Sequence, residues 1–187
     1  MRNDGAPTMT PLPERRTATR SREALASEHA RIKRGGHYAA LCFLDLDRFR
    51  EVNNKYGYQA GDQLLLSFYQ RLREQLRTTD TVFRWGGEEF VLLAPQIDRL
   101  ELREFAERLR QLVACEPFTI SGEWLTVTCS VGAALLDEWR EPEAVLEVAS
   151  QLVRVAKEKR NTVEVEVEDE STGGGALRTA RAALSSE

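Results

Sequence analysis

Apolar residues follow two different spacings along this chain of 187 residues, and each spacing predicts a kind of element. The continuous apolar run 39–46 predicts a central strand that is covered on both faces. Every odd position from 125 to 135 is apolar, which predicts a second strand. The runs 81–85 and 90–94 predict a β-hairpin, and the alternating Val and Glu of 163–167 predict an exposed final strand.

Helical spacing of apolar residues predicts five helices around these strands. They cover residues 14–34, 47–56, 62–77, 102–113 and 142–156. The first is basic and ends at two glycines, and the last begins with Pro142, a residue that suits the first turn of a helix. Helices and strands in this order predict an α/β sandwich with helices packed on a central sheet.

The length of the chain predicts one domain with a single core. Residues 1–13 hold three prolines without periodicity and are expected to be a flexible lead-in. Residues 14–168 form the expected domain. Residues 169–187 include three consecutive glycines and are expected to be a flexible tail.

Composition excludes several classes of function. The formal net charge of −4 argues against a general nucleic-acid binder, which is normally basic. No apolar stretch is long enough to span a bilayer, and the first residues lack the apolar core of a secretory signal. Cys42, Cys115 and Cys129 lie far apart and are expected to be buried free thiols. We therefore expect a cytoplasmic protein without membrane contact in this segment.

The tip of the predicted hairpin holds two adjacent glycines and two adjacent carboxylates, Gly86-Gly87-Glu88-Glu89. Glycine reaches positive φ without a Cβ penalty, so the pair predicts a tight turn. A bare backbone also lets a phosphate approach closely, and adjacent acids can hold a divalent metal beside it. Taken alone, the tip is more typical of a solvated hairpin with ordinary surface acids.

Two aspartates at the end of the run 39–46 change this interpretation. Asp47 is expected to cap the following helix, but Asp45 lies inside the apolar run, where an unpaired charge is costly. Ligands of α/β proteins collect where strands end. A carboxylate from the strand end and one from the hairpin tip would form an oxygen site for Mg²⁺.

Three segments together resemble a known family. They are 43–53 (FLDLDRFREVN), 57–62 (GYQAGD) and 86–90 (GGEEF), and in this order they are similar to the GGDEF domain, the catalytic module of diguanylate cyclases. The resemblance covers roughly residues 10–165. It implies a fold similar to the palm of nucleotidyl cyclases and polymerases, with a central, mainly antiparallel sheet flanked by helices.

The resemblance also implies a reaction and its partners. Such domains condense two GTP molecules into cyclic di-GMP and release pyrophosphate, with Mg²⁺ or Mn²⁺ as the metal. One domain binds one GTP, so catalysis implies a homodimer, brought together by an upstream sensor or receiver domain.

Residue roles follow by similarity. Asp45, Glu88 and Glu89 are the implied catalytic residues, and Asp45, Glu88 and the backbone carbonyl of Leu46 are the implied metal ligands. The implied GTP contacts are Asn53, Asp62, Gly86, Gly87, Arg50, Lys157 and Arg160. Asn53 and Asp62 would read guanine, although Asp62 is alternatively a helix cap.

A second implied site binds the product. Arg77-x-x-Asp80 matches the inhibitory motif of the family, with Arg108 as a secondary arginine. Arginine offers a planar fork for guanine or phosphate, and aspartate pairs with the guanine edge. The alternative is a surface pair at a helix end, which contributes little.

The chain departs from the family pattern on both sides of the site. Pro11 and Glu14 replace the usual glycine and asparagine near the start. The segment 157–161 (KEKRN) is one residue short and lacks a glycine, and just before it Ser150 and Arg154 replace aspartate and tyrosine. Two alternatives therefore stay open: a catalytically weak domain that binds cyclic di-GMP or GTP, and a dimerising regulatory domain.

Overall fold

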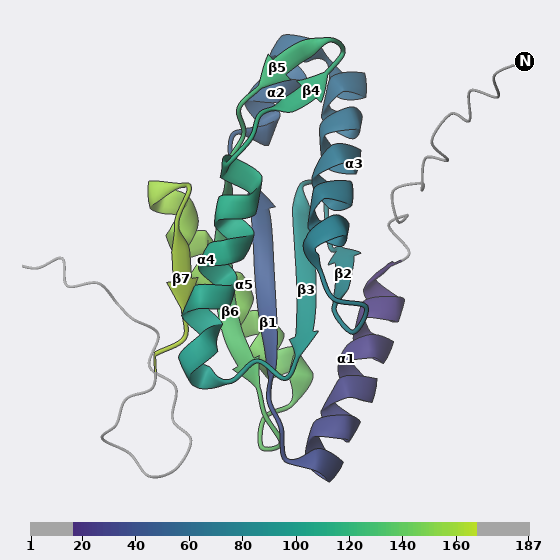
Figure 1. The fold of residues 1–187 in the computed structure, drawn as a ribbon, viewed down its shortest axis with the longest axis vertical. Coiled ribbons are helices and arrows are strands. Elements are labelled where there is room, and N and C mark those ends of the chain that lie inside the picture. The colour runs from purple at the N-terminus through teal and green to yellow at the C-terminus, as the bar shows by residue number, and fades with distance from the viewer. Residues whose placement is uncertain (1–16, 168–187) are drawn as a thin grey trace, which may run out of the picture.

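The computed structural model describes residues 17–167, and the predictions for residues 1–13 and 169–187 lie outside the described residues. A five-stranded sheet forms the centre, in the order β2-β3-β1-β6-β7 (Figure 1). The helices are α1 (Thr17–Gly35), α2 (Phe49–Tyr56), α3 (Tyr58–Gln75), α4 (Arg99–Ala114) and α5 (Pro142–Lys159). The strands are β1 (Ala39–Leu46), β2 (Thr81–Arg84), β3 (Glu89–Pro95), β4 (Phe118–Ile120), β5 (Glu123–Leu125), β6 (Cys129–Leu136) and β7 (Val163–Val165).

The sheet is mainly antiparallel, as the resemblance implied. β1 lies between β3 and β6 and pairs antiparallel with both, and β2 pairs antiparallel with β3. Only the short β7 runs parallel to its neighbour β6. α2, α3 and α4 pack their apolar side chains on one face, and α1 and α5 cover the other (Figure 1). The α/β sandwich with helices on a central sheet is confirmed.

β1 occupies the predicted range 39–46 because both of its faces are covered: every residue except Asp45 is buried. The hairpin β2–β3 and the helices also follow the predicted periodicity. α3, however, begins at Tyr58, before the predicted residue 62. Gly57 separates α2 from α3 with φ 85°, a backbone angle that glycine tolerates and other residues rarely adopt.

The single strand predicted over 125–135 is wrong. Residues 126–128 belong to no strand, and the alternation continues through them because Val127 is buried between the exposed Thr126 and the half-buried Thr128. Residues before this break form a small separate hairpin, β4–β5, that the sequence reasoning missed. Its signal was Ser121-Gly122, a two-residue turn in which both residues have positive φ.

Arg71 of α3 ties the β4–β5 hairpin to the main body. Its guanidinium donates to the carbonyl oxygens of Val113, Glu116 and Pro117 at 3.2, 2.7 and 3.1 Å. The same group lies 3.6 Å above the centre of the Phe118 ring. One side chain therefore closes the carboxyl end of α4 and positions the first residues of β4.

α5 packs unusually close to β6. A Cβ added at Gly132 would lie 2.3 Å from backbone atoms of both Ala149 and Val153. Only glycine fits at this contact, so β6 and α5 are held at one fixed separation. This contact sets the position of the C-terminal half of α5, which carries Lys157.

Two of the three predicted buried thiols are buried, Cys42 and Cys129, whereas Cys115 is exposed. Burial raises the pKa of the Cys42 and Cys129 thiols and keeps them neutral. Within residues 17–167, no helix is long and apolar enough to cross a membrane.

Candidate active site at the end of β1

The pairing of β1 with β3 brings the predicted carboxylates together. Asp45 lies directly opposite Glu89 in the antiparallel register. The next residue, Leu46, donates its backbone N–H to the carbonyl of Glu88 at 3.3 Å. The strand end and the hairpin tip therefore form one acidic edge.

The hairpin tip spans residues 85–88, but the reason given for its glycines was wrong. Neither Gly86 nor Gly87 has a positive φ. A Cβ on Gly86 would instead lie 2.6 Å from a carboxylate oxygen of Glu89, while one on Gly87 would meet no atom within 4 Å. Gly86 leaves room for the Glu89 carboxylate, and Gly87 leaves the tip open.

Arg84, which the sequence reasoning did not single out, braces this tip. Its guanidinium donates to the carbonyl of Gly87 at 2.8 and 3.1 Å and to that of Gly86 at 3.3 Å. The backbone N–H of Trp85 closes the turn on the carbonyl of Glu89 at 2.8 Å. The acids are thus carried on a fixed loop, which suits the positioning of charge.

Burial raises the pKa of Asp45 to about 6, and the neighbouring charges of Glu88 and Glu89 act in the same direction. The contact with Lys157 opposes this shift. A carboxylate held at such a cost at a strand end is typical of a functional site.

Lys157 reaches this edge from α5. Its Nζ lies 2.6 Å from Oδ1 of Asp45, an ion pair without the alignment of a hydrogen bond. The ammonium donates to the carbonyl oxygen of Leu46 at 2.7 Å and lies 3.7 Å from Oδ1 of Asp47. A residue expected to bind phosphate therefore contacts two of the atoms expected to bind metal.

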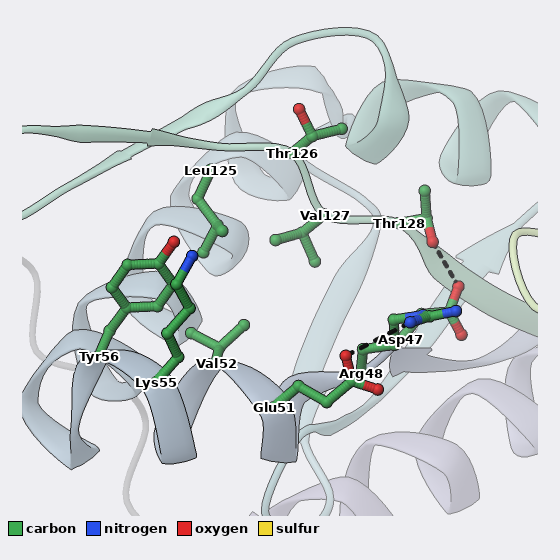
Figure 2. Close-up of a pocket in the computed structure, with 10 residues that line it drawn as sticks. All are labelled: Asp47, Arg48, Glu51, Val52, Lys55, Tyr56, Leu125, Thr126, Val127 and Thr128. Carbon is green, nitrogen blue, oxygen red and sulfur yellow. Dashed lines mark hydrogen bonds and ion pairs between the residues drawn. The ribbon is translucent and has the colours of Figure 1, made fainter.

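Asp47 does not cap α2, contrary to expectation. The N-cap is Arg48, which has φ 57° and makes no side-chain cap bond. The Asp47 carboxylate is buried and accepts from the hydroxyl of Thr128 at 2.6 Å (Figure 2). It accepts from the hydroxyl of Ser130 at 2.8 Å as well. It also accepts the backbone N–H of Asn161 at 2.8 Å. Asp47 thus joins three segments that are distant in sequence.

A pocket of about 360 Å³ lies between α2 and residues 125–128 (Figure 2). Arg48, Glu51 and Lys55 line it at helical spacing, so it opens on one face of α2. Asn53 and Asp45 do not line this pocket. Asp47 does line it, so the pocket borders the acidic edge without including Asp45.

The proposed guanine readers lie where α2 meets α3. Oδ1 of Asn53 is buried without a hydrogen-bond partner among the described residues. A Cβ on Gly61 would lie 1.9 Å from that oxygen, so glycine makes room for the Asn53 side chain. Asp62 is exposed inside α3 and does not cap it, because the helix begins at Tyr58. Arg50 is exposed on α2.

The shortened turn after α5 is strained. Arg160 follows the helix with φ 59° and ψ 165°, a region favoured only by glycine, and Asn161 has φ 44°. The side chain of Arg160 is exposed. Arg160 therefore adopts, without a glycine, a positive-φ conformation that favours glycine.

The residues of the inhibitory motif are only partly assembled. Asp80 is buried, and its carboxylate accepts the backbone N–H of Arg77 at 2.9 Å, which closes the turn before β2. The Arg77 side chain is exposed. Arg108 lies on α4 with its guanidinium 5.1 Å from the centre of the Phe105 ring. In residues 17–167, no hydrogen bond or ion pair joins Arg108 to Arg77 or Asp80.

The acidic edge fits a divalent metal shared with a phosphate substrate. No group of three or more His, Cys, Asp or Glu side chains among residues 17–167 is arranged to hold a metal alone. Mg²⁺, however, is usually held by one or two carboxylates together with substrate phosphates. The oxygens of Asp45 and Leu46 already surround one cation, the Lys157 ammonium, so the donor set suits a hard cation.

A mainly antiparallel sheet with helices on both faces, and a carboxylate edge at the end of its central strand, defines a palm-like α/β domain. The family model described as "Diguanylate cyclase, GGDEF domain" matches residues 7–162. The chain belongs to this family.

Named relatives agree with this assignment. The chain is 39% identical over 158 residues to diguanylate cyclase DgcP of Pseudomonas aeruginosa, covering 84% of this chain and 23% of DgcP. It is 36% identical over 159 residues to the response regulator PleD of Caulobacter vibrioides, covering 83% and 34%. The chain thus spans a quarter to a third of these relatives.

Solved structures share the fold. The GGDEF domain of YfiN (also called TpbB) from Pseudomonas aeruginosa superposes with a TM-score of 0.75 at 28% identity, covering 81% of this chain and 96% of that one. Diguanylate cyclase SiaD from Pseudomonas aeruginosa, solved with its activator SiaC, gives a TM-score of 0.74 at 32% identity, covering 82% and 58%.

Proposed function

We propose that this domain is a diguanylate cyclase that condenses two GTP molecules into cyclic di-GMP with release of pyrophosphate. The observation that carries the proposal is the acidic edge, where Asp45 and the carbonyl of Leu46 already hold a cation opposite Glu88 and Glu89. Family membership supports the same reaction.

Each residue of the edge has a role in this proposal. Asp45, Glu88 and the Leu46 carbonyl hold Mg²⁺ or Mn²⁺, with Glu89 beside them. The metal, when bound, supplies positive charge that lowers the pKa of the attacking ribose 3′-hydroxyl and neutralises charge on the phosphates. Gly86 and Gly87 lie against the phosphates, because a backbone without Cβ atoms admits close approach.

Base recognition falls to the junction of α2 and α3. The unpartnered Oδ1 of Asn53 is an acceptor for a guanine N–H, since a buried acceptor without a partner gains most from one. Asp62 accepts from the guanine N1 and N2 donors. Arg50, Lys157 and Arg160 provide positive charge for the phosphates.

Catalysis requires two copies of the domain, because one copy binds one GTP. We propose that an upstream sensor or receiver domain pairs them in the intact protein. Cyclic di-GMP is both product and inhibitor, held by Arg77 and Asp80 with Arg108. The exposed Arg77 side chain supports this role. Because Asp80 is engaged in its own turn, most of the attraction would come from the arginines.

The test is incubation of concentrated protein with GTP and Mg²⁺, followed by chromatography of the nucleotides. We expect cyclic di-GMP and pyrophosphate, lost in Glu88→Gln and retained in Glu51→Gln, which changes an exposed glutamate that pairs with Arg48. Arg77→Ala should relieve inhibition by added product.

A catalytically weak binding module is the second candidate. The strained Arg160 and the engagement of Lys157 with Asp45 favour it, because both residues are implied phosphate contacts. Absence of product, together with cyclic di-GMP binding that Arg77→Ala abolishes, would replace the cyclase proposal with this one.

A further inference from the structure

Lys157 contacts the acidic edge in a way that phosphate binding does not require. Its ammonium lies 2.6 Å from Asp45 and 2.7 Å from the carbonyl oxygen of Leu46, the two donors that β1 offers to a metal. The third neighbour is the buried carboxylate of Asp47 at 3.7 Å. The ammonium therefore has an all-oxygen surrounding of the kind that a divalent cation prefers.

The surroundings make this contact strong. The side chains of Lys157 and Asp45 are 27% and 16% exposed, and that of Asp47 is 2% exposed. Removing the ammonium would leave two carboxylates close together in a partly buried place, which is costly. A cation at this edge relieves that cost while no metal is bound.

A metal and the ammonium cannot use the same donors together. Both would lie within about 3 Å of the same oxygens and therefore close to each other, and two like charges so placed repel strongly in a site of low dielectric. Lysine carries its charge on a flexible four-carbon stem, so the ammonium can leave the edge while α5 stays in place.

We propose that the Lys157 ammonium is the resident counter-cation of the acidic edge in the nucleotide-free protein, and that a divalent metal binds there only by displacing it. The displaced ammonium is then free to meet the phosphates that arrive with the metal. Lys157 thus couples metal binding to nucleotide binding, because the metal displaces the ammonium most easily when nucleotide phosphates are present to bind that ammonium. The inference rests on the proposed function, which assigns these oxygens to a metal.

The test is a titration of the nucleotide-free protein with Mn²⁺, in which electron paramagnetic resonance measures the concentration of unbound ion. Lys157→Met keeps the length of the stem and removes the charge. We expect it to bind Mn²⁺ at least about tenfold more tightly than the unchanged protein. Lys159→Met removes the same charge two residues away, from an exposed position, and should change the affinity by less than about twofold.

The outcomes separate this inference from the proposed function. Equal Mn²⁺ affinities in the Lys157 variant and the unchanged protein, with cyclic di-GMP still produced by the latter, would overturn the inference alone. Failure of every protein to bind Mn²⁺ with or without GTP, and to make product, would overturn both.

A second measurement needs no loss of charge. The ε-carbon of Lys157 can be followed by ¹³C magnetic resonance in the unchanged protein, with its signal assigned by its absence from Lys157→Arg. On addition of Mg²⁺ alone, we expect that signal to move toward the shift of a solvated lysine while the other lysines stay unchanged. A signal that stays in place at saturating Mg²⁺ would overturn the proposal.

Discussion

Replacement of Arg160 by glycine should stabilise this protein. Arg160 adopts φ 59° and ψ 165° immediately after α5, in a region that side chains with a Cβ rarely enter. Its conformation is imposed by the surrounding bonds. Its N–H donates to the carbonyl of Ala156 at 2.9 Å, and its carbonyl accepts from the Thr162 hydroxyl at 2.7 Å. The next N–H, of Asn161, donates to Asp47.

The magnitude follows from two opposing terms. Backbone strain of this kind costs about 1–3 kcal/mol in a residue other than glycine. Glycine gains freedom in the unfolded chain, which offsets about 0.5–1 kcal/mol of that. We therefore expect Arg160→Gly to raise the free energy of unfolding by about 1 kcal/mol. For a chain of this length, the melting temperature should rise by about 2–4 °C.

The assay is thermal and urea unfolding of Arg160→Gly beside Arg160→Ala. Both variants lose the guanidinium, but alanine keeps the Cβ and the strain, so their difference isolates the backbone term. Lys159→Gly is the positional control: it lies in the helical last turn of α5, where glycine should destabilise by about 1 kcal/mol. If Arg160→Gly is no more stable than Arg160→Ala, the reasoning about strain is wrong.

Four further predictions address the framework and the site. Gly132→Ala should lower the free energy of unfolding by about 3 kcal/mol or more in urea titrations, because its Cβ would lie 2.3 Å from the backbone of α5; a loss under about 1 kcal/mol would contradict the close contact. Arg71→Met should lower the free energy of unfolding, measured by thermal unfolding, by about 3 kcal/mol, because three carbonyls lose a charged donor. Arg71→Lys should lose only part of this free energy. Burial holds the pKa of Asp45 at about 6, above the value of about 3.9 in the unfolded chain. Between these two pH values the folded state binds more protons than the unfolded state, so the free energy of unfolding falls as pH rises from about 4 to about 6. Asparagine does not titrate, so the free energy of unfolding of Asp45→Asn, measured in urea, should rise by up to about 2 kcal/mol relative to that of the unchanged protein when the pH goes from 4 to 7.5. The same difference between the two proteins at both pH values would contradict this. Gly86→Ala should lower turnover about tenfold at little cost in stability, because the new Cβ displaces the flexible end of a carboxylate; Gly87→Ala, with open space around its Cβ, is the matched variant and should alter mainly the KM for GTP.

Long apolar patterns made the centre of the fold predictable. β1 was located to the residue because a strand buried on both faces needs an unbroken apolar run. The strand predicted over 125–135 failed because its alternation records burial, which continues through residues 126–128, and not strand pairing, which stops there. β4 and β5 have three residues each, too few for a period to show.

The carboxylates of the acidic edge could be predicted from the sequence, whereas the hydrogen bonds that hold the neighbouring Asp47 could not. Asp45 could be singled out because a charge inside an apolar run needs a reason. The role of Asp47 could not, because its partners Thr128, Ser130 and Asn161 lie 81, 83 and 114 residues away in the chain. From local sequence, a carboxylate before a helix is most simply a cap. Only the fold brings those three donors to it.

The missing residue in segment 157–161 therefore has a local consequence. Lys157 lies before the deletion, on the part of α5 that is fixed against β6 at Gly132, so its reach to Asp45 does not depend on the turn. The turn itself absorbs the shortening through the left-handed backbone of Arg160, while Asp47 holds the following N–H. The shortening thus affects the backbone of Arg160 and leaves the contact of Lys157 with Asp45 in place. Loss of activity, if it occurs, should then appear in the KM for GTP and not in metal binding.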